Sequence, residues 1–233
     1  LLDDPSEMAN PRQAFANNPM VDASIEMDYR GVSPMFGGKP RYADGRELDI
    51  DAANSFAKAH YEQHCATRGT ITVGDKAMDI DGFGLRDKSW GPRFWQAIAW
   101  YSWLPIVFGD DFAMMISLIA TSADKPPRRG GMVLVGDEYQ LITDCRIDTE
   151  WDGNHEPTSM RCRATTDHDT YEVTGTVLSK IPLRNRRTTP DGESLHTRIT
   201  EAMTRFECNG RRGIGMAEYL DQVVDGRPVG APE

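Results

Sequence analysis

Apolar and polar residues alternate along much of this chain, which is the pattern of strands with two different faces. The clearest case is VDASIEMDYRGV, residues 21–32, where every second residue from Val21 to Tyr29 is apolar and the residues between them are polar. Successive side chains of a strand point to opposite faces. This stretch therefore predicts a half-buried strand with one face in water, placed at the edge of a sheet.

Further strands are predicted after residue 58. HYEQHCATRGTITV, residues 60–73, reads as extended, and a turn at Gly74–Lys76 leads into another strand that begins KAMDIDG. Residues 93–103 and 111–121 are apolar on both faces, as in a strand buried on both sides. After residue 130 the chain reads as hairpins, with turns at 136–137 and 167–169.

The remaining segments predict loops and short helices. Residues 1–48 are rich in Pro, Gly, Asn and Asp, so NPRQAFANNP and PMFGGKPRYADGRE predict loops. Asp49 or Asp51 could cap a short helix that runs to Lys58, and residues 216–224 carry a helical pattern. Many short strands with a turn every ~8–12 residues indicate a mostly antiparallel β barrel or sandwich.

Charge and cysteine content narrow the partners and the location. The net charge is −10, from 36 acidic and 26 basic residues, and a negative field repels phosphates, so we expect no nucleic-acid partner. The longest apolar run, residues 112–120, falls short of the ~20 residues of a membrane span. Four cysteines without a CxxC pair, and no visible secretory signal, predict reduced thiols and a cytoplasmic protein.

The segment LRDKSW, residues 85–90, places charge beside the most aromatic part of the chain. On a strand, Asp87 shares a face with Leu85 and Ser89, while Arg86 and Trp90 take the other face. An acid on an apolar face is desolvated, which favours its protonated form and makes it a possible proton donor to an alkene or carbonyl. The alternative is that Asp87 pairs with an arginine and holds a turn, as buried carboxylates usually do.

Four of the five tryptophans lie within residues 90–103, a density that favours the wall of a ligand pocket over simple packing. Aromatic faces also stabilise a developing carbocation. Asp87 is the predicted catalytic acid, with Arg86 and Arg93 orienting it or binding a polar group of the substrate. The predicted ligand-binding residues are Trp90, Trp95, Trp100, Tyr101, Trp103 and Met114.

Metal and cofactor motifs are weak in this sequence. His60 and His64 form the one close histidine pair, and a metal site there would need a third ligand such as Glu62. We interpret them as solvent-facing or hydrogen-bonded histidines and predict no metal site. The chain has no G-x-S-x-G, no Walker loop and no complete dinucleotide fingerprint, so no cofactor is implied.

GFGLRDKSWGPR, residues 82–93, resembles the G-x-G-x-R-D-H-S-W-G-x-R signature of a group of uncharacterised bacterial proteins with a lipocalin-like, two-domain β architecture. That group is similar to the AttH-like proteins and the carotenoid 1,2-hydratases. Lys88 stands where the signature has His. The ending GIGMAEYLDQVVDGRP is also similar to that group, and the resemblance covers about residues 60–230. The matching positions are Gly82, Gly84, Arg86, Asp87, Ser89, Trp90, Gly91 and Arg93.

The resemblance implies two packed, calycin-like β domains around a hydrophobic cavity. Residues 1–78 would be the end of a first, incomplete domain with loops, and residues 79–233 a second lipocalin-like domain. The start LLDDPSEMANP has no initiator Met, so we expect a piece of a longer polypeptide. For the hydratases the resemblance implies that an acid protonates a C=C bond and that water captures the cation, with Asp87 the best-placed acid.

We therefore predict a hydratase or lyase acting on an isoprenoid, lipid or steroid-like molecule. A non-catalytic binding protein for such molecules is the first alternative, and a structural hinge between two β domains at RDKSWG is the second. The expected partners are a hydrophobic small molecule and either the rest of the same polypeptide or a second copy of the chain.

Overall fold

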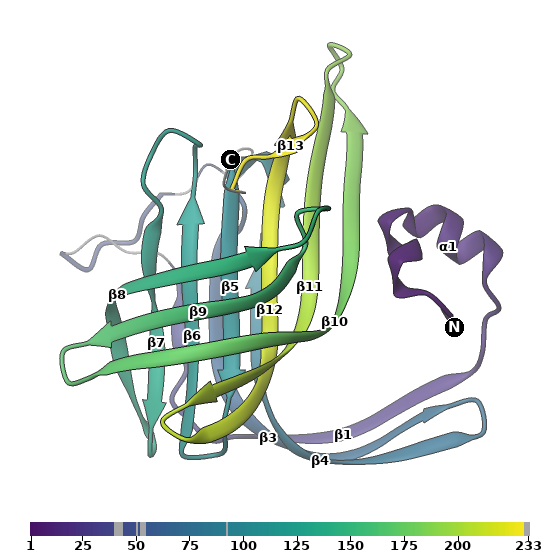
Figure 1. The fold of residues 1–233 in the computed structure, drawn as a ribbon. Coiled ribbons are helices and arrows are strands. Elements are labelled where there is room, and N and C mark those ends of the chain that lie inside the picture. The colour runs from purple at the N-terminus through teal and green to yellow at the C-terminus, as the bar shows by residue number, and fades with distance from the viewer. Residues whose placement is uncertain (40–43, 50, 52–54, 92, 231–233) are drawn as a thin grey trace.

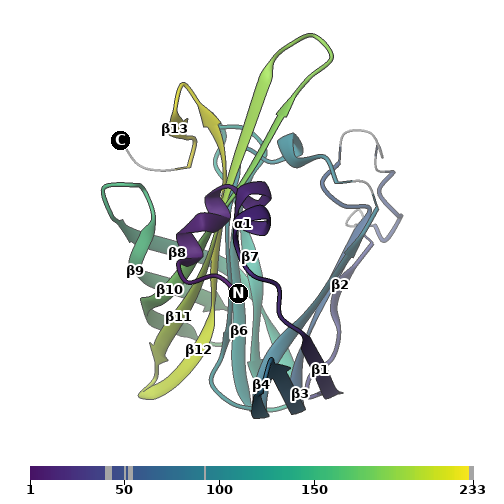
Figure 2. The ribbon, with the colours of Figure 1, turned by 90° about the vertical axis from the view of Figure 1, so that its right-hand side faces the viewer.

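The computed structural model describes residues 1–39, 44–49, 51, 55–91 and 93–230. Among these residues the chain forms a closed antiparallel barrel and a separate four-stranded sheet that lies against one side of it (Figures 1 and 2). The predicted antiparallel, mostly β class is confirmed.

Eight consecutive strands build the barrel, each antiparallel to the next, and the last pairs with the first to close it. Short β13 (Arg227–Pro228) extends from the end of the last barrel strand. The barrel strands are β5 (Trp100–Val107), β6 (Phe112–Ala120), β7 (Arg128–Val135), β8 (Glu138–Trp151), β9 (Pro157–Thr166), β10 (Thr170–Thr188), β11 (Ser194–Cys208) and β12 (Arg211–Val224).

The inside of the barrel is filled by apolar side chains that alternate along these strands. On β6, for example, Met114 and Ile116 point inward and are fully buried. The four cysteines are free and buried, as the sequence predicts for reduced thiols. Because the inward side chains fill the barrel, the residues of β5, β6 and β12 that point outward face the second sheet or solvent.

The second sheet is built on β3 (Ala59–Val73), which pairs with β4 (Lys76–Trp90) along its whole length. β1 (Ala23–Gly31) and β2 (Phe36–Gly38) pair with the other edge of β3. The half of the sheet that carries β1 projects away from the barrel (Figure 1). β1 pairs with β3 alone, so its predicted position at the edge of a sheet is confirmed. Its predicted half-burial is wrong, because this part of the sheet projects into solvent and every residue of β1 except Met27 is exposed.

Other local predictions are also wrong, and β2 lies within the segment PMFGGKPRYADGRE that the sequence predicts to be a loop. NPRQAFANNP is not a loop but contains α1 (Pro11–Asn17), which follows η1 (Pro5–Ala9), with Asn10 as its side-chain cap. Residues 216–224 continue β12. Residues 93–103 do not form one strand, because η2 (Trp95–Ala97) precedes β5.

Two further expectations concern a short helix before β3 and a domain boundary between residues 78 and 79. Of the expected helix from Asp49 or Asp51 to Lys58, residues 50 and 52–54 lie outside the described part, and residues 55–58 are not helical. The boundary between residues 78 and 79 falls within β4, which pairs with β3 rather than with the barrel. No helix among the described residues is long and apolar enough to cross a membrane.

Candidate functional site

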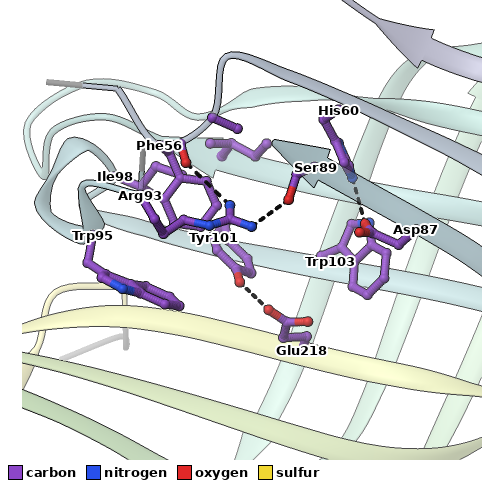
Figure 3. A pocket seen from close by; sticks show the side chains of 12 residues that line it. Phe56, His60, Asp87, Ser89, Arg93, Trp95, Ile98, Tyr101, Trp103 and Glu218 are labelled. Carbon is purple, nitrogen blue, oxygen red and sulfur yellow. Dashed lines mark hydrogen bonds and ion pairs between the residues drawn. The ribbon is translucent and has the colours of Figure 1, made fainter. Parts of the chain in front are cut away.

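A pocket of about 430 Å³ lies between the outer face of the barrel and the β3–β4 sheet (Figure 3). It is outside the barrel, whose interior is occupied by the main core. Barrel strands, sheet strands and the segments before β3 and β5 each contribute to its wall. The lining residues are Phe56, Ala57, His60, Asp87, Ser89, Arg93, Trp95, Ile98, Tyr101, Trp103, Ile119 and Glu218.

Strand alternation explains the barrel side of the pocket. Tyr101 and Trp103 are the outward residues of β5, whose inward residues Leu104 and Ile106 belong to the core. Trp103 lies opposite Glu218 on β12, and Tyr101 opposite Ile119 on β6. The register of three neighbouring strands thus places an aromatic and aliphatic surface around one carboxyl group.

The sheet side of the pocket comes from the hairpin of β3 and β4. His60 is paired with Ser89, and Glu62 with Asp87, so all four side chains share the face toward the barrel. Arg86 and Trp90 point the other way, where Arg86 lies 5.2 Å from the Tyr61 ring and Trp90 packs edge-on against it. The predicted division of residues 85–90 between two faces is confirmed.

His60, Glu62 and Asp87 form a compact polar cluster at this wall. His60 Nε2 is 2.6 Å from Asp87 Oδ2 and 3.6 Å from Glu62 Oε1. The hydrogen bond with Asp87 is the main reason that the pKa of His60 is raised. Glu62 is 1% exposed, and its burial raises its pKa to about 6, although Trp103 Nε1 donates a 2.8 Å hydrogen bond to its Oε1.

Glu218 is the carboxyl on the barrel side. Tyr101 donates a hydrogen bond to its Oε1 (Figure 3). Burial is the largest influence on Glu218 and raises its pKa, with the Asp87 charge acting in the same direction. The neighbouring Glu201, directly opposite on β11, also has a raised pKa, about 7, from burial and from the Glu218 charge. The pocket thus joins an apolar surface to carboxyl groups that hold their protons unusually well.

Arg93 closes one end of the pocket without pairing with Asp87. Its guanidinium donates to Ser89 Oγ and to the Phe56 carbonyl, and lies 4.3 Å from the Phe56 ring. The expected Asp87–arginine pair is therefore wrong, because His60 takes that place. The expected burial of Asp87 is also wrong, since its side chain is 40% exposed.

The structure brings Asp87, Arg93, Trp95, Tyr101 and Trp103 of the predicted site together at the pocket. It places the other four predicted residues elsewhere. Arg86 and Trp90 are on the far face of the sheet, while Trp100 and Met114 point into the barrel with the main core.

Sequence reasoning missed His60, Glu62 and Glu218 as site residues. The H-x-E spacing of His60 and Glu62 marks a shared strand face, but only the hairpin register brings Asp87 beside them. Glu218 was hidden by the wrong helical assignment of residues 216–224. Read as a strand, that segment alternates Ala217 and Tyr219 inward with Glu218 and Leu220 outward.

Solved structures of similar fold include CghA, with a TM-score of 0.54 and 12% identity over 88% of this chain. They also include a candidate AttH protein from Nitrosomonas europaea, with a TM-score of 0.53 and 13% identity over 87% of this chain. The chain spans 62% of the length of either protein. This likeness shows that the chain shares the fold of these two proteins and agrees with the predicted lipocalin-like architecture.

A comparison with curated proteins found no match. Residues 7–223 match a family described as a domain of unknown function, DUF7064, over nearly the whole chain. The chain belongs to the DUF7064 family.

Proposed function

We propose that this pocket is the active site of a hydratase or lyase that adds or removes water at a C=C bond of a largely apolar small molecule. The observation that carries the proposal is Glu218, a carboxyl with a raised pKa at the aromatic wall of the pocket. A carboxyl group whose burial beside an apolar ligand raises its pKa is a suitable general acid. The resemblance of residues 82–93 to the signature of a group similar to the carotenoid 1,2-hydratases supports the same class of reaction.

In the direction of hydration, Glu218 gives its proton to one alkene carbon. Tyr101 donates to Oε1, so Oε2 is the oxygen left to carry that proton. The π bond supplies the electrons of the new C–H bond, and the positive charge left on the other carbon faces Trp95, Tyr101 and Trp103. Aromatic rings stabilise such a charge through their negative faces.

Asp87 is the base in this proposal rather than the acid that the sequence predicts. Its Oδ2 is held by His60, which leaves Oδ1 to accept a proton from the attacking water. The water oxygen forms the C–O bond, and the proton on Asp87 returns to Glu218 through solvent. The exposure of Asp87 suits this role, because a base that works on water needs contact with it.

A second candidate is a binding protein without chemistry. The observation in its favour is that two charged groups of the lining already have partners: Arg93 donates to Ser89 and to the Phe56 carbonyl, and Glu218 accepts from Tyr101. An apolar molecule could then occupy the pocket by burial alone.

The test is a panel of isoprenoids such as myrcene, linalool, geraniol and farnesol, with product analysis by mass spectrometry and binding followed by tryptophan fluorescence. We expect turnover of at least one compound by the native chain. The variant Glu218→Gln should lose at least about 100-fold in kcat, the scale of general acid catalysis, while its Kd stays within about threefold. Glu207→Gln, an exposed position on β11, is the matched control and should behave as the native chain.

Binding without turnover of any compound would favour the binding protein. Turnover by Glu218→Gln at the native rate would remove Glu218 from the mechanism.

We also propose that the protein is cytoplasmic, and that it packs against either the rest of the same polypeptide or a second copy of the chain. The four free, buried thiols support a reducing location. The exposed β1 half of the sheet supports a further contact there.

A further inference from the structure

We propose that His60, Glu62 and Asp87 bind a divalent transition-metal ion such as Zn²⁺, with an open coordination position toward the pocket. This inference deepens the proposed function, and it rests on that function only for the use of the ion, not for its binding. The sequence suggests His60 and Glu62 as metal ligands only together with His64, and Asp87 joins them only through the register of the β3–β4 hairpin.

The first support is the short distance between the possible ligand atoms of the three residues. One donor atom from each of the three side chains lies within 4.8 Å of the other two. His60 and Glu62 are alternate residues of β3, and Asp87 is the partner of Glu62 in the register, so the backbone fixes all three on one face. Zinc bonds of about 2.0–2.2 Å in a tetrahedral site place ligand atoms roughly 3.3–3.6 Å apart. The 3.6 Å between His60 Nε2 and Glu62 Oε1 lies in this range, whereas the 2.6 Å between His60 Nε2 and Asp87 Oδ2 is a hydrogen bond that would lengthen when an ion takes the place of the shared proton.

The second support is independent of the spacing. Glu62 is 1% exposed, and its Oε2 has no hydrogen-bond partner among the described residues. A buried carboxylate oxygen without a partner is costly, and coordination of a cation is one of the few ways to satisfy it. Trp103 Nε1 donates to the other oxygen, Oε1, which is also the one that lies 3.6 Å from His60 Nε2, so an ion held by both oxygens of Glu62 would satisfy Oε2 as well. Hydrogen bonds of this kind orient the ligands of metal sites.

The donor set selects the type of ion. One imidazole nitrogen with two carboxylate oxygens suits Zn²⁺ or Mn²⁺, whereas Mg²⁺ and Ca²⁺ prefer oxygen alone. Three protein ligands leave a fourth position of a tetrahedral ion for water. Because His60 and Asp87 both line the pocket, that position opens toward the ligand space.

An ion here would supply the water of the proposed reaction. With the ion bound, Asp87 would be a ligand rather than the base, and the ion would take over that role by letting its water lose a proton to solvent near neutral pH. The resulting hydroxide forms the C–O bond at the carbon left positive when Glu218 has given its proton to the neighbouring carbon. The released solvent proton restores Glu218, so the sum is alkene plus water to alcohol.

The test is a titration of the full chain, first stripped with a chelator, with Co²⁺ followed by visible absorption and with Zn²⁺ followed by calorimetry. We expect one equivalent of either ion. Glu62→Gln and Asp87→Asn should each weaken binding at least tenfold, while circular dichroism shows that both variants fold. His168→Ala, in the exposed Asp167–Asp169 turn, is the control for surface binding and should leave the affinity unchanged.

Absence of a stoichiometric site, or equal affinity in the native chain and both ligand variants, would overturn the inference. If Glu62→Gln does not fold, the exposed Asp87→Asn alone decides the question. Failure of ion binding leaves the isoprenoid assay unaffected, and an inactive chain that binds Co²⁺ normally would contradict the proposed reaction but not the site.

Discussion

The pair of carboxyl groups on the outer face of the barrel gives a quantitative test of how strongly this wall favours protonated acids. Glu201 on β11 lies directly opposite Glu218 on β12. Burial, and then the Glu218 charge, raise the pKa of Glu201 from 4.5 to about 7. A carboxyl with a higher pKa in the folded than in the unfolded chain binds its proton more tightly when folded. Its contribution to stability is therefore full below pH 4.5 and is lost as the pH rises through 7.

The size of this effect follows from the pKa change. At about 1.4 kcal/mol per pKa unit, a rise from 4.5 to about 7 corresponds to about 3.5 kcal/mol. Glu201 is only partly buried, and solvent screening reduces this value, so we expect about 1–2 kcal/mol. Glu201→Gln removes the charge and keeps the shape. The variant should match the native chain at pH 4.5 and exceed its free energy of unfolding by about 1–2 kcal/mol at pH 8.

Urea unfolding followed by tryptophan fluorescence from pH 4.5 to 8.5 measures this difference directly. Glu207→Gln on the same strand loses an exposed ion pair with Arg212 and should cost under about 1 kcal/mol at pH 8. If the stability difference between Glu201→Gln and the native chain is the same at pH 4.5 and pH 8, the reasoning about buried, proton-holding carboxyls is refuted.

Two further predictions concern the barrel and its wall. Gly131 has φ +135° and a Cβ there would stand 1.9 Å from the Met115 carbonyl oxygen, so Gly131→Ala should lower the free energy of unfolding by more than about 2 kcal/mol in urea melts. Gly130→Ala, where a Cβ meets nothing within 4 Å, should change it by under about 1 kcal/mol, and equal losses would contradict the fold at β7. Tyr101→Phe removes a hydrogen bond that lowers the pKa of Glu218, so carboxyl titration by carbon-13 NMR should give a higher pKa for Glu218 in the variant. An unchanged or lower value would mean that the tyrosine does not act on this acid.

Many of the strands could be predicted because the order of apolar and polar residues within each segment indicates a strand. Residues 112–120 are apolar on both faces and form a barrel strand covered on both sides. Residues 216–224 show where such reasoning fails. Met216, Tyr219, Leu220 and Val223 fit a helical period, and the alternation of the same segment fits a strand equally well. Pairing with β5 and β11 decided between them, and that pairing depends on residues far away in the chain.

Only those parts of the candidate site that are formed by residues close together in the sequence could be predicted. The density of aromatics at residues 90–103 located one wall, and strand alternation placed Asp87 on the correct face. The partner of Asp87 could not be predicted, because His60 reaches it only through the register of a long hairpin. Glu218 lies 115 positions along the chain from Trp103, so only closure of the barrel brings the two residues together.

The most direct test of the central claim is the fate of the proton that Glu218 is proposed to deliver. The native chain is incubated in D₂O with an isoprenoid alkene that it hydrates, and the product is analysed by mass spectrometry and NMR. The account predicts one deuterium on the carbon adjacent to the new C–O bond, delivered to a single face, and loss of this product with Glu218→Gln. Hydration without deuterium at that carbon, or deuteration by Glu218→Gln at the native rate, would contradict it.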